Sequence, residues 1–209
     1  MNIRSAAASA LALLLCSCAS TSVEHTWKSP EYRGGPQTKL AVLTIDERGM
    51  LRQGFENRFA RQLGEQGASV VKTFDLLSLA EINQDKPAAA ERLRSAGADA
   101  VVIMHLTNLS STYRESRPGG ERWAPVITGI ESGYWYDYYS VAYADMSPTY
   151  GDLKHKVFLE TGLFDLTTGK RLWSGVTQSV FTESMDRVAE MDKIVGKVVT
   201  AMRKDAVVP

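Results

Sequence analysis

The residue types that most often carry out catalysis are scarce in this chain and form no recognisable group. Its 209 residues include three histidines, His25, His105 and His155, and two cysteines. The histidines are too far apart for the H-x-x-x-H or H-E-x-x-H spacing that places two imidazoles on one metal ion. The sequence also lacks G-x-S-x-G and Walker phosphate-binding loops. We therefore expect no catalytic residues, no metal site and no cofactor, and a protein that is not an enzyme.

The two cysteines, Cys16 and Cys18, follow a segment that is typical of exported proteins. Arg4 supplies positive charge near the amino terminus, and residues 6–15 form a short apolar run. This run is too short for a transmembrane helix, which needs about 20 apolar residues. The pattern predicts a cleaved signal peptide, which we place at residues 1–17.

The segment Leu15-Cys16-Ser17-Cys18 resembles the lipobox of bacterial lipoproteins, in which an aliphatic residue stands three positions before the modified cysteine and a small residue directly before it. The resemblance implies cleavage before Cys18 and a thioether between its thiol and a diacylglyceryl group. The alternative is an ordinary secreted protein that is cut at a small residue such as Ser17 or Ala19. With Cys18 lipidated, the mature chain has no free thiol, which excludes disulfides and thiolate catalysis.

A lipid on Cys18 would anchor the protein to a membrane. Several acyl chains, palmitate among them, bind a bilayer more stably than the marginal attachment of a single chain. Ala19 and Ser20 follow the cysteine, and the absence of Asp there implies, by resemblance to sorted lipoproteins, the outer membrane with the domain facing the periplasm. The chain has 24 Lys and Arg against 24 Asp and Glu, so its charge favours no nucleic acid partner.

Alternating strand and helix patterns predict the fold. Residues 18–38 are rich in Gly, Pro and polar side chains, so we expect a flexible lipidated tether with at most one strand near residues 25–28. Residues 39–209 should then form one domain of α/β to α+β class, with a single mixed sheet of about five strands and two or three packing helices. The expected strands are 39–45, 69–73, 100–106, 156–164 and 171–181, and the clearest helices are 51–63, 88–96 and 184–204.

An aromatic insert at residues 110–151 interrupts this pattern. It contains seven of the eight tyrosines and two of the four tryptophans, and its densest part holds Trp135, Tyr136, Tyr138 and Tyr139. Loops of this length are usually functional or disordered. Three interpretations remain open: the insert covers the sheet, the four rings form a partner-binding surface, or they form a platform for envelope glycan.

The order of motifs resembles a family of uncharacterised bacterial lipoproteins known only as a domain of unknown function. The resemblance is carried by Ala98-Asp99-Ala100 before a strand, by the Tyr/Trp-rich cluster at 133–139, and by a D-x-x-T-x-K-x-x-W pattern from Asp165 to Trp173. Residues 39–106 are also similar, more weakly, to the α/β domains of two envelope proteins. These are the amino-terminal domain of TolB and the curli-secretion lipoprotein. These resemblances imply a small mixed sheet and an adaptor or assembly role in the envelope.

The sequence as a whole predicts a non-enzymatic envelope lipoprotein that binds a protein partner or assembles with itself. A glycan-binding module at the cell envelope is the alternative, because stacked aromatic rings suit sugars. A hydrolase with an unrecognised site is the outside alternative, because fold class does not determine function.

Overall fold

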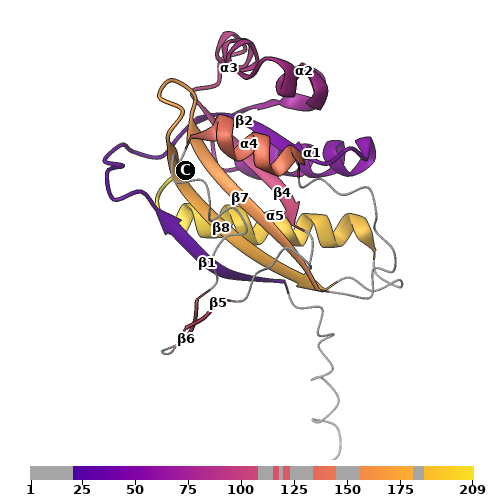
Figure 1. Cartoon of the computed structure of the whole chain (residues 1–209), viewed down its shortest axis with the longest axis vertical. Helices are drawn as coiled ribbons and strands as arrows, with labels where there is room; N and C mark the ends of the chain where they lie inside the picture. The colour runs from indigo at the N-terminus through magenta and orange to yellow at the C-terminus, as the bar shows by residue number, and fades with distance from the viewer. Residues whose placement is uncertain (1–20, 108–114, 118–119, 123–133, 145–155, 181–185) are drawn as a thin grey trace, which may run out of the picture.

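Six strands pair into one mixed β-sheet in the order β1-β8-β7-β4-β2-β3 (Figure 1). The computed structural model describes residues 21–107, 115–117, 120–122, 134–144, 156–180 and 186–209. Strand β2 runs parallel to β3 and β4, whereas the pairs β4–β7, β7–β8 and β8–β1 are antiparallel. The strands of this sheet are β1 Ser22–Lys28, β2 Lys39–Ile45, β3 Ser69–Lys72, β4 Ala100–Thr107, β7 Lys156–Asp165 and β8 Arg171–Val180. The short strands β5 Glu115–Arg117 and β6 Gly120–Arg122 form a separate antiparallel pair.

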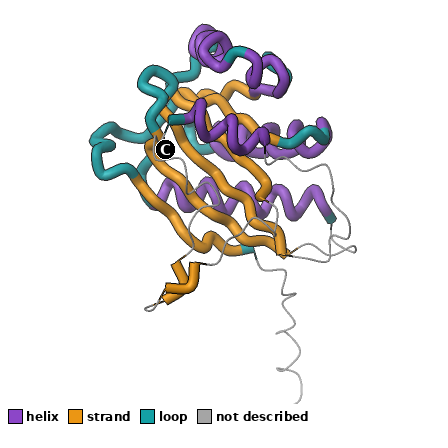
Figure 2. Tube along the Cα trace, viewed as in Figure 1, coloured by secondary structure: helices purple, strands orange, loops and turns teal. Residues whose placement is uncertain are grey.

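Helices cover both faces of the sheet, so the core has two halves (Figure 2). Helices α1 Gly49–Gly64 and α5 Arg187–Lys204 pack on one face. Helices α2 Leu79–Gln84, α3 Lys86–Ser95 and α4 Trp135–Ala144 pack on the other face, and a 3-10 turn, η1 Thr73–Asp75, follows β3. Within the described ranges, no helix is long and apolar enough to cross a membrane.

Local sequence explains where the helices begin and end. Ser78 and Glu81 form a capping box at the start of α2, and the Asp85 side chain accepts a hydrogen bond from the backbone of Ala88 at the start of α3. Gly67 and Gly97 have positive φ angles after α1 and α3, a conformation that favours glycine. Capping residues and glycines therefore set where these helices begin and end.

The predicted fold class is confirmed: the chain forms a single mixed sheet with helices packed on it. The sheet has six strands rather than about five, and five helices rather than two or three surround it in the described part of the chain. Local patterns do not mark the additional elements clearly: β1 is rich in polar residues, α2 has six residues, and α4 lies in the aromatic insert.

Strand β1 lies within residues 18–38, where the sequence predicts a tether with at most one strand near residues 25–28. Residues Ser22–Lys28 pair with β8, and the register joins Ser22 to Gln178 and Trp27 to Ser174. The folded domain therefore begins before Lys39, because backbone hydrogen bonds to β8 hold a segment whose polar composition suggested a flexible linker. Residues 1–17 and Cys18 lie outside the described residues.

Candidate functional site

The predicted lipidation site lies just ahead of the sheet. Cys18 itself is outside the described residues, but β1 begins at Ser22, four residues later. A chain of four residues spans at most about 14 Å. A lipid on Cys18 would therefore hold the edge of the sheet close to the membrane surface.

The four aromatic residues proposed as a partner-binding surface belong to α4 and face mainly inward. Trp135, Tyr138 and Tyr139 are buried, and Tyr136 is half-buried. Within α4, a helix rich in rings buries most of them against the apolar sheet face. Of the three interpretations of the insert, the one in which it covers the sheet describes α4.

Specific contacts hold α4 in place. The Tyr139 hydroxyl donates a 2.7 Å hydrogen bond to the backbone carbonyl of Leu79 at the start of α2. The ring of Tyr138 packs against Phe164 of β7, with 5.2 Å between centroids, and the backbone N–H of Trp135 donates to the carbonyl of Gly169. Helix α4 thus ties α2 to the β7–β8 hairpin.

A buried pair of ionisable side chains lies on the same sheet face as α4. His105 of β4 and Glu160 of β7 are directly opposite each other in the antiparallel register, and both are almost fully buried. Neither carboxylate oxygen of Glu160 has a hydrogen-bond partner in the described part of the structure, and the same holds for the Tyr138 hydroxyl. Buried polar atoms of this kind are rare in folded proteins and mark a site of interest.

The electrostatics of this pair follow from burial. Burial raises the pKa of Glu160 to about 7, an effect that the positive charge of Arg171 partly offsets. Burial also lowers the pKa of His105 to about 4, against the opposing influence of the Asp46 carboxylate. The pKa of Tyr138 rises well above its usual value through burial and the negative charge of Glu160. Near neutral pH the site therefore holds a neutral imidazole beside a carboxyl group that is poised to titrate.

Glu56 is also buried, but its carboxylate accepts several hydrogen bonds. Glu56 of α1 accepts hydrogen bonds from the backbone N–H of Phe74 at 2.7 Å and from Arg52 Nε at 3.0 Å, besides two further donors. This network fastens α1 to the turn after β3 and is structural. Glu160 has no such hydrogen-bond partners among the described residues, so its buried carboxyl group is not stabilised in this way.

The sequence analysis did not bring His105 and Glu160 together. In the sequence, His105 lies in the apolar run 100–106 and Glu160 lies in the expected strand 156–164, and no motif links the two. The available signal was a single glutamate in the otherwise apolar and small run of β7. The pairing itself depends on the register between β4 and β7, which residue types do not encode directly.

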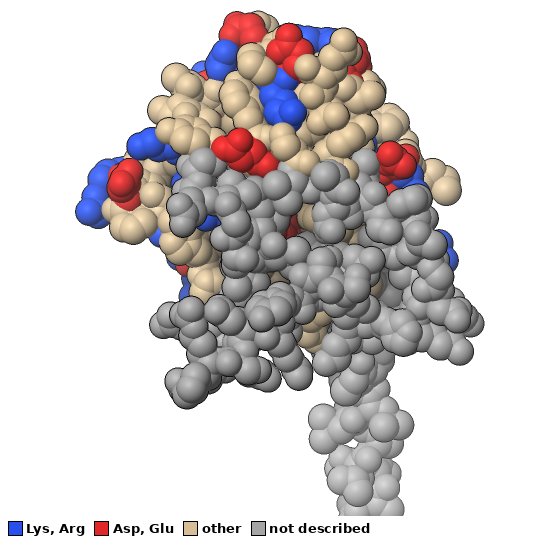
Figure 3. All heavy atoms as spheres, viewed as in Figure 1, with Lys and Arg blue, Asp and Glu red and all other residues tan. Residues whose placement is uncertain are grey.

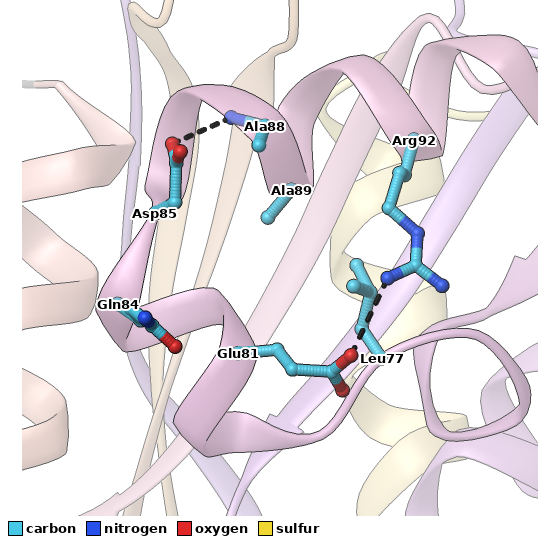
Figure 4. A pocket seen from close by; sticks show the side chains of 7 residues that line it. All are labelled: Leu77, Glu81, Gln84, Asp85, Ala88, Ala89 and Arg92. Carbon is cyan, nitrogen blue, oxygen red and sulfur yellow. Dashed lines mark hydrogen bonds and ion pairs between the residues drawn. The ribbon is translucent and has the colours of Figure 1, made fainter.

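A groove of about 380 Å³ opens between α2 and α3 (Figure 4). Leu77 and Ala89 form apolar parts of its lining, and Glu81 and Arg92 approach each other across it at 3.5 Å. Glu81 also accepts hydrogen bonds from Ser78, and Asp85 accepts one from Ala88, so both carboxylates serve as helix caps. Hydrogen bonds from Ser78 lower the pKa of Glu81. The groove follows from the capping geometry of two short helices.

Among the residues that the structure describes, no cluster of three or more His, Cys, Asp or Glu side chains could hold a metal ion. His105 and Glu160 supply only two such groups, and His155 lies outside the described residues. The described site therefore consists of a buried titratable pair and the aromatic helix α4 that packs on the same face.

The fold and the described residues define a single α+β domain with a mixed six-stranded sheet and helices on both faces. No family model and no curated protein matches the chain. Among solved structures, the chain is similar to the PelC dodecamer from Paraburkholderia phytofirmans, at 14% identity and a TM-score of 0.47, over 87% of this chain and 96% of that chain.

Two further structures are similar to the chain. One is lipoprotein GNA1162 from Neisseria meningitidis, at 18% identity and a TM-score of 0.42, over 79% of this chain and 96% of that chain. The other is a PDZ domain protein from Parabacteroides distasonis, at 11% identity and a TM-score of 0.42, over 88% of this chain and 35% of that chain. These likenesses assign no function to the chain, and the expected membership of an uncharacterised lipoprotein family stays a prediction.

Proposed function

We propose that this protein is a lipoprotein of the bacterial envelope, anchored by a lipid on Cys18 to the periplasmic face of the outer membrane, and that its domain acts by binding rather than by catalysis. The observation that carries the proposal is the short distance along the chain from Cys18 to the sheet. Strand β1 begins four residues after the cysteine of the lipobox-like segment. The anchor and the folded domain are thus almost continuous.

The two cysteines allow a matched test of the anchor. Cells that express the chain are fed an alkyne-bearing palmitate, and incorporation is measured after purification. Cys18→Ser should abolish labelling because the acceptor thiol is lost, whereas Cys16→Ser should leave it unchanged because Cys16 departs with the signal peptide. Labelling that survives Cys18→Ser overturns the proposed anchor.

The open edge of β1 supports a role in binding a protein partner or a second copy. In the described part of the sheet, β1 pairs with β8 on one side only, and it is seven residues long. Edge strands of this length present unpaired backbone groups that can accept a further strand. The other edge strand, β3, is four residues long and presents fewer unpaired backbone groups.

Site-specific crosslinking tests this role. A photoreactive amino acid at the exposed position Glu24 of β1 should capture a partner in intact cells, whereas the same group at the exposed position Glu91 of α3 should not. A crosslinked product of twice the chain mass would identify self-association. Equal capture at both positions, or none at Glu24, overturns binding through this edge.

The arrangement of the buried pair supports a non-catalytic role. Glu160 and His105 are 2% and 1% exposed, so a substrate has no access to them in this state. The glycan-binding alternative requires exposed rings along a groove. Of the four aromatic rings on α4 proposed for this role, those of Trp135, Tyr138 and Tyr139 are buried. No observation on the described residues favours that alternative or the hydrolase.

A further inference from the structure

One end of the sheet gathers the start of β1 with the ends of its neighbours. In a single row across the strands, Ser22 pairs with Gln178, Gln178 with Phe158, and Phe158 with Thr107. We call this the anchor end of the domain, because Cys18 precedes Ser22 by only four residues.

The two long helices also begin at the anchor end. Helix α1 follows β2, whose last residue, Ile45, pairs with His105 near the end of β4. Helix α5 follows β8, whose final residues lie in the row just described. The two helices therefore start on the same side of the sheet and at the same end of it.

Direct contacts place the first turn of α5 beside the middle of α1. Arg58 of α1 donates one hydrogen bond to the carbonyl of Gly54, at 2.6 Å, and another to the carbonyl of Val188 in α5, at 3.2 Å. The first turn of α1 carries Met50, whose exposed fraction is 87%, and the first turn of α5 carries Val188, at 58%. Two large apolar side chains thus project into solvent at the anchor end.

The remaining exposed apolar side chains in the described residues differ from this pair. Phe74, at 37% exposure, lies beneath the guanidinium of Arg52, with 5.5 Å between Arg52 Cζ and the ring centroid. Tyr134, at 40%, forms a β-bridge with Lys170 at the β7–β8 turn, which is the opposite end of the sheet. Met50 and Val188 therefore stand out by exposure and by place.

Resting on the proposed lipid anchor at Cys18, we propose that the anchor end lies on the bilayer surface and that Met50 and Val188 insert among the lipid headgroups. The connection from Cys18 to Ser22 reaches at most about 14 Å, so the lipid surface is the nearest large apolar phase to this end. Removing exposed apolar surface from water is favourable.

The charges on the described surface agree with an apolar contact. On the coloured part of the visible face, acidic and basic side chains are interspersed, with no broad region of one sign (Figure 3). The full chain has equal numbers of acidic and basic residues. Attraction to anionic lipids is therefore not needed, and the orientation follows from the short connection and from the two apolar side chains.

Single-cysteine labelling tests this orientation in the full lipidated chain. With Cys18 acylated and Cys16 removed, Met50→Cys, Val188→Cys and Tyr134→Cys each introduce one reactive thiol. Each variant is labelled with a small fluorophore and reconstituted in vesicles of phosphatidylethanolamine and phosphatidylglycerol, with or without a nitroxide on the lipid headgroup. We expect strong loss of fluorescence at positions 50 and 188 and none at position 134.

Each outcome decides between the claims. Equal quenching at all three positions, or none at 50 and 188 in a chain that floats with the vesicles, overturns the orientation and leaves the anchor intact. Labelling of Cys18 itself, together with failure to float, overturns both the anchor and the orientation.

Discussion

The indole Nε1 of Trp173 donates a 2.8 Å hydrogen bond to a carboxylate oxygen of Asp205, so the start of β8 is joined to the residue that ends α5. Lys28, which is opposite Trp173 in the β1–β8 register, donates a 2.7 Å hydrogen bond to the backbone carbonyl of the same aspartate. Asp205 therefore connects the edge strand that follows the anchor to the body of the domain.

This connection predicts a measurable coupling between Trp173 and Asp205. In a double-mutant cycle with Trp173→Phe and Asp205→Ala, the coupling in the free energy of unfolding should be about 1 kcal/mol, as for a hydrogen bond to a partly exposed carboxylate. Urea unfolding followed by circular dichroism measures it. The matched control is Asp192→Ala, because Asp192 of α5 bonds Arg61 of α1 instead. Trp173→Phe and Asp192→Ala should be additive, and equal coupling for both aspartates would contradict the assignment.

The raised pKa of Glu160 predicts that ionising this residue destabilises the domain. Its pKa is about 7 in the folded chain against an ordinary value of 4.5, so the folded state binds more protons than the unfolded state between these values. The contribution of Glu160 to the free energy of unfolding therefore falls as pH rises from about 4.5 to about 7. Glu160→Gln removes the ionisation, and its advantage over the unmodified chain should grow through this window to about 3 kcal/mol at alkaline pH. Urea unfolding across the window measures the difference, and a difference that does not vary with pH would refute the prediction.

The lowered pKa of His105 predicts the opposite pH dependence, a free energy of unfolding that rises with pH. Its pKa is about 4 in the folded chain against 6.5, so the unfolded state binds more protons between these values and stability rises with pH. The two slopes largely cancel from about pH 4.5 to about pH 6.5, where the windows overlap. In His105→Asn, the free energy of unfolding should therefore fall with pH through the ionisation of Glu160. In a double variant with Glu160→Gln, it should vary little with pH. If His105→Asn left the pH profile of the unmodified chain unchanged, the lowered pKa of the histidine in the folded chain would be refuted.

The sequence predicted the central part of this fold because its elements carry strong local patterns. The apolar run of β4 and the long apolar face of α5 are each recognisable without knowledge of the rest of the chain. The turn between β7 and β8 is equally local, since Gly169 has a positive φ angle and the Asp165 side chain accepts hydrogen bonds from the backbone of Thr167 and Thr168.

Strand β1 and helix α4 depend instead on contacts distant in the sequence. Strand β1 contains Glu24, His25 and Lys28, and it forms because β8 supplies its hydrogen-bond partners. Helix α4 is made of residues with modest helix propensity, such as Tyr and Trp, and it is stabilised by burying them. The proximity of His105 to Glu160 also depends on distant contacts, because it is set by the register between β4 and β7.

The buried hydroxyl of Tyr139 predicts a specific loss when α4 is altered. Tyr139→Phe keeps the ring but removes the hydrogen bond to the Leu79 carbonyl, so the free energy of unfolding should fall by about 1 kcal/mol. Tyr136→Phe is the matched control, because Tyr136 is half-buried and its change should alter stability by less than about 0.5 kcal/mol. Urea unfolding gives both values, and amide hydrogen exchange in α2 should accelerate only for Tyr139→Phe, since that helix loses its tie to α4. Equal small effects at both positions would mean that α4 does not pack on α2, and would restore its rings as a candidate contact surface.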